Sequence, residues 1–287
     1  MNLLSLFAFA VYAAGTVISP IPDDMTIVTP IPPKPDVSFG QIAAIPTPTP
    51  QVLGEATAIT PTPIPPPLLT KKKSYTIAFL GDSMIDTMGP SLPAVNNKLS
   101  LTYPATNFTL LNYGVGGTNI DYGIERITNG YTYLGNQIPS LVSTHPDIVV
   151  VESFAYNPFP ITSGVDRHWM ALAKAVDTIR QHLPGAKIII AATIAPNSTV
   201  FGDGAAGLAF SKEDKFIRTA LINQYLDSTV KFAASQHLPL ADAYHASLNA
   251  NGDGILTYIN GGDHIHYSDA GRALFAQKVV SALQAVL

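Results

Sequence analysis

Two short motifs in the chain combine residue types that can carry out nucleophilic chemistry. A Gly-Asp-Ser triplet ends at Ser83, directly after the apolar segment 75–80, and Asp263 lies three residues before His266 near the end of the chain. A carboxylate can hold the Nδ1–H of a nearby imidazole while Nε2 takes the proton of a serine hydroxyl. These residue types suit attack by Ser83 on an acyl carbon, with His266 as the base.

Attack on an acyl carbon also needs hydrogen-bond donors for the oxygen that becomes negative in the transition state. Residues 112–117 (NYGVGG) contain three glycines, which let backbone N–H groups approach a ligand closely. Asn157 follows a third apolar run and can donate from its side-chain amide. The plainer alternatives are a flexible glycine turn and a turn asparagine before a proline.

The segments that must position these residues alternate between strand and helix patterns. Continuous apolar runs predict strands that are covered on both faces, as in a parallel sheet. They span residues 75–80, 109–113, 147–151, 187–193 and 238–241. Apolar stripes of helical period span 165–183, 212–237 and 268–287, and place Trp169, Phe216 and Phe275 in the core.

This alternation predicts an α/β fold, a three-layer α/β/α sandwich around a five-stranded parallel sheet of flavodoxin-like type. In such sheets, loops at the carboxyl ends of the strands carry the chemistry. Ser83, the block 112–117 and Asn157 all follow predicted strands. The Asp263–His266 loop directly precedes the last helix, for which Ser268 is a candidate N-cap. We therefore expect all four loops to meet at one edge of the sheet.

The composition excludes several classes of function. The formal net charge is −4, and the 16 Lys and Arg residues are spread along the chain, unlike the basic face of a nucleic-acid-binding protein. Because the sequence has no cysteine, it has no disulfide, no thiolate metal site and no cysteine nucleophile. His264 and His266 form a His-x-His pair, but no further cluster of ligands supports a metal. We expect no metal, no cofactor and no nucleic-acid partner.

The first quarter of the chain differs in composition from the rest. Residues 1–18 are apolar and carry no charged side chain, which predicts a signal peptide or an N-terminal membrane anchor. Fourteen of the 24 prolines lie between Pro20 and Pro67, so residues 19–73 predict an extended Pro/Thr-rich linker, either a stalk or a passive spacer. Residues 74–287 are left for one folded domain. Both alternatives for 1–18 place that domain outside the cytoplasm, secreted or anchored.

With these motifs in order, residues 75–287 resemble the SGNH hydrolases, the GDSL-like esterases and lipases. The serine of that family lies in a GDS motif, matched by Ser83, with Met84 where leucine is usual. The family's glycine block, Asn-x-Gly-x-(Ser/Gly)-Gly, is matched by residues 112–117. Its Asp-x-x-His motif is matched at 263–266.

One block departs from the family. Where the family has Gly-x-Asn-Asp, this chain has Phe-Ala-Tyr-Asn-Pro at 154–158, without the glycine, and Asn157 is the natural candidate. The resemblance implies a serine esterase that needs no cofactor, with the catalytic triad Ser83, Asp263 and His266. It also implies an oxyanion hole made of the Ser83 and Gly117 backbone N–H groups and the Asn157 side chain.

The resemblance leaves the substrate open, as an acylated small molecule or polysaccharide. An exported domain favours acetyl esters on an envelope or extracellular polysaccharide. The alternatives are a short-chain lipid or aryl esterase, a glycan O-acetyltransferase, and a catalytically silent envelope-binding domain. We expect the protein to be a monomer.

Overall fold

A computed structural model describes residues 72–160 and 162–287. The signal peptide or anchor predicted at 1–18 lies outside the described residues, as does the predicted linker apart from its last two residues. No helix within the described ranges has the length and apolar character that crossing a membrane requires.

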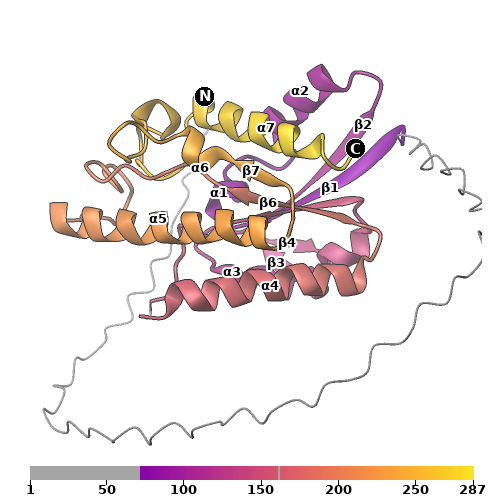
Figure 1. Ribbon diagram of the computed structural model, residues 1–287, viewed down its shortest axis with the longest axis horizontal. Coiled ribbons are helices and arrows are strands. Elements are labelled where there is room, and N and C mark those ends of the chain that lie inside the picture. Colours follow the sequence, from indigo (N-terminus) through magenta and orange to yellow (C-terminus); the bar gives the residue numbers. More distant parts are fainter. Residues whose placement is uncertain (1–71, 161) are drawn as a thin grey trace, which may run out of the picture. The chain divides into compact units, whose positions relative to one another are not determined.

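The described part is built around a five-stranded sheet in which every strand is parallel to its neighbours (Figure 1). The strand order is β2-β1-β5-β6-β7, so the chain starts in the interior of the sheet, adds β2 on one side and then extends the sheet on the other. This confirms the predicted parallel sheet. Its strands are β1 (Ser74–Gly81), β2 (Asn107–Gly114), β5 (Ile148–Glu152), β6 (Lys187–Ala192) and β7 (Leu240–Asp242).

Helices cover both faces of the sheet, which confirms the three-layer sandwich. The alternate residues Ala78, Leu80, Val149 and Val151 pack in one apolar cluster with α3 (Ile120–Thr128), α4 (Gly164–His182) and α5 (Lys212–Ser235). Their neighbours in the strands, such as Phe79, pack in a second cluster with α2 (Pro93–Thr102) and α7 (Asp269–Leu283). Figure 1 shows these two layers on opposite sides of the strands. Because both faces are buried, the central strands β5 and β6 have continuous apolar runs rather than apolar residues at every second position.

The predicted long helices form close to their expected ranges. The shorter elements are not predicted from the sequence. Ser268 is the N-cap of α7, where its side chain accepts the Gly271 N–H. A small antiparallel hairpin, β3 (Tyr131–Tyr133) and β4 (Asn136–Ile138), stands apart from the main sheet. The α-helices are α1 (Ser83–Asp86), α2 (Pro93–Thr102), α3 (Ile120–Thr128), α4 (Gly164–His182), α5 (Lys212–Ser235), α6 (Ala243–Ala246) and α7 (Asp269–Leu283), and Leu141–Thr144 and Leu256–Tyr258 form 3₁₀ helices.

The prediction that Phe216 packs in the core is wrong, since its side chain is 65% exposed. At the start of α5 the buried positions are Lys215 and Thr219 instead. The Lys215 ammonium lies 2.5 Å from the carboxylate of Asp203 and 3.4 Å from the carbonyl oxygen of Thr199. The first turns of α5 therefore face a polar loop that follows β6, and this turns Phe216 toward solvent. Further along, Phe232 is fully buried.

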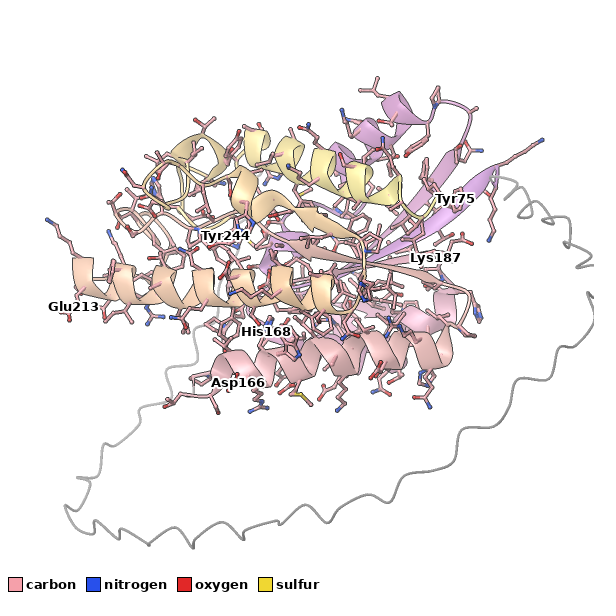
Figure 2. The ribbon with its side chains drawn as sticks, viewed as in Figure 1. Tyr75, Asp166, His168, Lys187, Glu213 and Tyr244 are labelled. Carbon is pink, nitrogen blue, oxygen red and sulfur yellow. The ribbon has the colours of Figure 1, made fainter. Side chains whose placement is uncertain are left out.

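Parallel strands give the sheet one amino edge and one carboxyl edge. In Figure 2, Tyr75 and Lys187 mark the amino ends of β1 and β6 on the same side of the molecule. The register aligns the other ends, because Gly81 pairs with Gly114 and Leu80 pairs with Val151. The loops after β1, β2 and β5 therefore leave the sheet side by side.

Candidate active site

The turn after β1 presents Ser83 at the carboxyl edge of the sheet. Asp82 is the N-cap of α1, and its Oδ1 accepts the Met84 N–H at 2.8 Å. Ser83 is thus the first residue of a short helix, and it is only partly buried. The helix lies close against β2 at Gly114, where a Cβ atom would stand 2.2 Å from the Asp86 nitrogen. Only glycine permits that approach.

The glycine loop after β2 lies beside this turn. The Asn112 amide donates to the carbonyl oxygens of Ile85 and Gly89, at 3.0 and 2.9 Å, and so joins β2 to the segment around α1. Gly117 has φ of +71°, a conformation that favours glycine. Among the residues that the structure describes, neither the Ser83 N–H nor the Gly117 N–H has a hydrogen-bond acceptor. Both are free to donate to a ligand.

The hairpin β3–β4 contributes a side chain to the same neighbourhood. The Tyr133 hydroxyl donates to Asp86 Oδ2 at 2.6 Å and accepts the Gly116 N–H at 3.2 Å. A Cβ atom placed on Gly116 would stand 3.9 Å from the Ser83 Cβ. The glycine loop is therefore next to the serine, and a tyrosine of the hairpin holds its backbone.

The loop after β5 brings Asn157 to the serine turn. The Asn157 amide nitrogen donates to Asp82 Oδ2 at 2.9 Å, so the residue before Ser83 orients the amide. An amide nitrogen has two hydrogens, and the second remains available for a ligand. The sequence pattern indicates Asn157 but not this role of Asp82, although Asp82 belongs to the Gly-Asp-Ser triplet.

Phe154 lies in this loop, which lacks the glycine of the family's block. It adopts φ of +51°, a left-handed conformation that costs a non-glycine residue on the order of 1 kcal/mol. Its buried ring packs against Gly123 of α3, and its N–H donates to Glu152 Oε2 at 2.9 Å. Packing and a buried carboxyl group thus hold a backbone shape that glycine would adopt more easily.

Two fully buried carboxyl groups lie beneath the site. Burial raises the pKa of Glu152 well above its ordinary value, and the nearby charge of Asp82 adds to the effect. Burial also raises the pKa of Asp82, while hydrogen bonds from Met84 and Asn157 oppose the rise. Because the rise is larger for Glu152 and the charge of Asp82 contributes to it, we assign the negative charge to Asp82 and the proton to Glu152.

The Asp263–His266 loop forms a compact unit before α7. His266 Nδ1 lies 2.8 Å from Asp263 Oδ2, and the other carboxylate oxygen accepts the Ile265 and His266 N–H groups at 2.9 and 3.0 Å. Burial alone would raise the pKa of Asp263, but these hydrogen bonds lower it to about 2. The carboxylate therefore stays ionised and fixes the ring by Nδ1, which leaves Nε2 free. The neighbouring His264 ring instead contacts the carbonyl oxygen of Asp203.

This loop lies near the serine turn, because Arg272 at the start of α7 donates to the carbonyl oxygen of Thr87, at the end of α1, at 3.3 Å. The charge of His266 lowers the pKa of Asp82, the residue before Ser83. Asp263 in turn contributes to the raised pKa of Tyr156, the residue before Asn157. Within residues 72–160 and 162–287, no hydrogen bond joins Ser83 Oγ to His266 Nε2. Contacts between a nucleophile and its base often tighten only when substrate binds.

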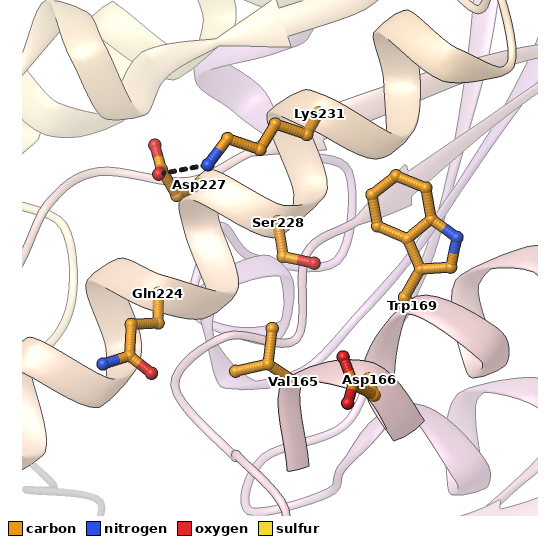
Figure 3. A pocket seen from close by; sticks show the side chains of 7 residues that line it. All are labelled: Val165, Asp166, Trp169, Gln224, Asp227, Ser228 and Lys231. Carbon is orange, nitrogen blue, oxygen red and sulfur yellow. Dashed lines mark hydrogen bonds and ion pairs between the residues drawn. The ribbon is translucent and has the colours of Figure 1, made fainter. Parts of the chain in front are cut away.

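A hollow of about 390 Å³ lies elsewhere, between α4 and α5 (Figure 3). Its walls include Trp169 and Ser228, and its one lysine, Lys231, is 3.0 Å from Asp227 in an ion pair. No histidine lines it, and an ion pair already engages its lysine. We place the reactive site at the carboxyl edge of the sheet, where candidate nucleophile, base and donors come together.

The sequence profile of the GDSL-like lipase/acylhydrolase family matches residues 79–274, from within β1 into α7. This match covers the serine turn, the glycine loop and the Asp263–His266 loop, and the chain belongs to that family. It is a carboxylic ester hydrolase. No curated protein matches the chain.

Solved structures of the same family share the fold. A lipase/acylhydrolase from Enterococcus faecalis aligns with a TM-score of 0.54 at 15% identity, over 74% of this chain and 97% of its own. A GDSL-like lipase from Bacteroides thetaiotaomicron aligns with a TM-score of 0.54 at 12% identity, over 74% of this chain and 89% of its own. At these identities the likeness concerns the fold alone.

Proposed function

We propose that this protein is an extracytoplasmic serine esterase that removes acyl groups, foremost acetyl, from an envelope or extracellular polysaccharide. Ser83 is its nucleophile, His266 its general base and Asp263 the partner of His266. The observation that carries the proposal is the 2.8 Å contact between Asp263 Oδ2 and His266 Nδ1. The charge of His266 also lowers the pKa of Asp82, the residue before Ser83. Ser83 itself lies beside backbone N–H groups that are free to donate.

The reaction proceeds through an acyl-enzyme. Ser83 Oγ attacks the ester carbonyl carbon while His266 Nε2 takes the hydroxyl proton, and Asp263 stabilises the imidazolium. The tetrahedral intermediate collapses when His266 returns that proton to the leaving alcohol oxygen. Water then attacks the acyl-enzyme, again with His266 as base, and releases the acid and free Ser83.

Three donors stabilise the negative oxygen of each tetrahedral intermediate. They are the backbone N–H groups of Ser83 and Gly117 and the second amide hydrogen of Asn157. Losing one such donor typically costs about 3 kcal/mol of transition-state stabilisation. Because these donors are held by other contacts, such as Asn157 by Asp82, they need not reorganise as the charge develops.

The location and substrate follow from the part of the chain that precedes the esterase domain. Its apolar, uncharged residues 1–18 favour export, and the proline-rich residues 19–73 favour an extended tether. A tethered esterase outside the cytoplasm would meet polysaccharides of the envelope or surroundings. We propose a monomer, since the predicted site draws all its residues from one chain.

Replacing the nucleophile tests the activity. Ser83→Ala should abolish turnover of p-nitrophenyl acetate, because no other hydroxyl can form the acyl-enzyme. Ser100→Ala is the matched control, since that exposed serine on α2 bonds only to the Asn96 carbonyl oxygen. Near-normal turnover by a folded Ser83→Ala protein would reject the proposed mechanism.

The substrate class needs a separate measurement. Acetate release from acetylated xylan, pectin and peptidoglycan should exceed, per active site, the turnover of p-nitrophenyl esters, and rates on those esters should fall as the acyl chain lengthens. Preference for long chains would favour a lipid or aryl esterase. Transfer of acetyl to an added glycan would favour an O-acetyltransferase. Failure of Ser83 to react with a fluorophosphonate probe would favour a silent binding domain.

A further inference from the structure

Arg126, on α3, is a buried cation that the mechanism above does not use. Its side chain is only 4% exposed, and among the described residues no carboxylate lies within salt-bridge distance of it. Placing a guanidinium group in the interior without a contacting anion is costly. A buried charge of this kind is therefore weak evidence for a stabilising role.

The hydrogen bonds of Arg126 join the two loops that carry the free backbone donors. Nη2 donates to the carbonyl oxygen of Gly81 at 2.9 Å, two residues before Ser83. Nη1 donates to the hydroxyl of Thr118 at 3.2 Å, one residue after Gly117. One rigid, planar group therefore spans the serine turn and the glycine loop.

Further contacts lock this bridge. The Thr118 hydroxyl donates to the Val115 carbonyl oxygen at 2.8 Å, and the Val115 N–H donates back to the Gly81 carbonyl oxygen at 3.2 Å. The guanidinium also stands over the Tyr131 ring of the hairpin, with its carbon 5.7 Å from the ring centroid. Arg126 thus reinforces a backbone hydrogen bond that already joins the two loops, and it extends the connection to Thr118, next to Gly117.

We propose that Arg126 is a positioning residue, which holds the Ser83 and Gly117 N–H groups at the spacing that the oxyanion requires and adds a fixed positive charge behind them. This inference rests on the proposed function. The guanidinium group donates only to uncharged backbone and hydroxyl oxygens, so its positive charge acts on the oxyanion through space. It acts on charge that develops in the transition state and contributes little to binding the neutral ester.

The test uses the variant Arg126→Met, which fills a similar volume without the charge or the donors. We expect kcat for p-nitrophenyl acetate to fall about 100-fold, as when an oxyanion donor is lost, with KM within about two-fold of its original value. Arg126→Lys keeps the charge but cannot span both acceptors, so it should recover only part of the loss. Arg180→Met, on the exposed side of α4, is the control and should leave both constants unchanged.

A purely structural role predicts a different result. It would lower the melting temperature and the amount of active enzyme, measured by fluorophosphonate titration, but leave kcat per titrated site intact. A folded Arg126→Met protein with kcat within three-fold of the original would overturn the inference. If that variant does not fold, Thr118→Val decides, because at nearly equal volume it removes the hydroxyl that accepts the Arg126 hydrogen bond and donates to the Val115 carbonyl oxygen. Its kcat per site should fall about three- to ten-fold, and an unchanged kcat would overturn the inference.

The two proposals fail separately. If Ser83→Ala is inactive and Arg126→Met turns over normally, the esterase mechanism stands and only the positioning role is lost. If Ser83→Ala remains active, the proposed function fails whatever Arg126 does.

Discussion

The molecule contains two Asp-x-x-His loops with the same local geometry, and only one lies at the candidate active site. In both, the His Nδ1 is 2.8 Å from the Asp Oδ2, and the other carboxylate oxygen accepts the histidine N–H at 3.0 Å. Asp242 and His245 form the first pair, at the end of β7. Asp263 and His266 form the second, before α7. Motif geometry alone therefore does not distinguish them.

What distinguishes the pairs is their surroundings. The His245 side chain is 50% exposed, whereas that of His266 is 13% exposed. In the sheet, β7 is three strand positions from β1, which puts its end about 14 Å from the serine turn. The charge of His266, by contrast, lowers the pKa of Asp82, the residue before Ser83. A catalytic pair is thus defined by the loops it faces, and the local motif only prepares the imidazole.

The largest expected effect separates the two pairs directly. Asp263→Asn should lower kcat for p-nitrophenyl acetate on the order of 10⁴-fold, because the amide favours the wrong tautomer of His266. Asp242→Asn makes the same chemical change in the other pair and should leave kcat unchanged. A loss of similar size in both variants, or a loss only in Asp242→Asn, would contradict the assignment of the base.

A smaller effect is expected at the loop that faces the Asp263 pair. Asn157→Ala should lower kcat about 100-fold while KM stays near its original value, because the amide contributes mainly to the transition state. The melting temperature should fall as well, because the variant removes a donor from the buried carboxylate of Asp82. Asn136→Ala, on the exposed hairpin strand β4, is the control. An unchanged kcat in Asn157→Ala would mean that another group completes the oxyanion hole.

Sequence alone predicts the parts of this molecule that have a period or a local motif. The five buried strands and the long helices are visible as apolar runs and stripes, and Ser268 is recognisable as an N-cap. Phe216 was misplaced because a stripe assumes that the whole helix packs on apolar surface. The start of α5 instead faces a polar loop, where Lys215 pairs with Asp203.

The supports of the candidate site carry no such signal. Arg126 has the pattern of an ordinary solvated residue on an amphipathic helix, and its two acceptors lie 45 and 8 residues away in sequence. Glu152 follows an apolar run, and an acidic residue at that position suggests only that the strand ends there. Nothing in the sequence indicates that its carboxyl group is buried and protonated. Contacts of this kind arise only when separate loops meet, so they become visible only in the folded structure.

Removing the Glu152 proton should have the smallest effect on catalysis among these changes. It should also alter how the stability of the protein depends on pH. In the unfolded chain Glu152 has the ordinary pKa of a carboxyl group, and in the folded protein burial raises that pKa well above it. Between the two values the folded state keeps a proton that the unfolded state releases. Stability is therefore complete below this window and falls as pH rises through it, by up to about 1.4 kcal/mol per pH unit.

Glu152→Gln removes that proton but keeps an oxygen for the Phe154 N–H, so the loop that carries Asn157 should hold its shape. The free energy of unfolding in urea, measured from pH 5 to pH 8, should fall less steeply in this variant than in the original protein, while kcat at pH 7 changes least of the three variants. Glu125→Gln, exposed on α3, should leave the slope unaltered. Parallel pH profiles for the original protein and Glu152→Gln would show that Glu152 is ionised in the folded state. The carboxyl groups beneath the serine turn would then carry two charges, and the Asp263 pair would differ from the Asp242 pair by facing a more negative site.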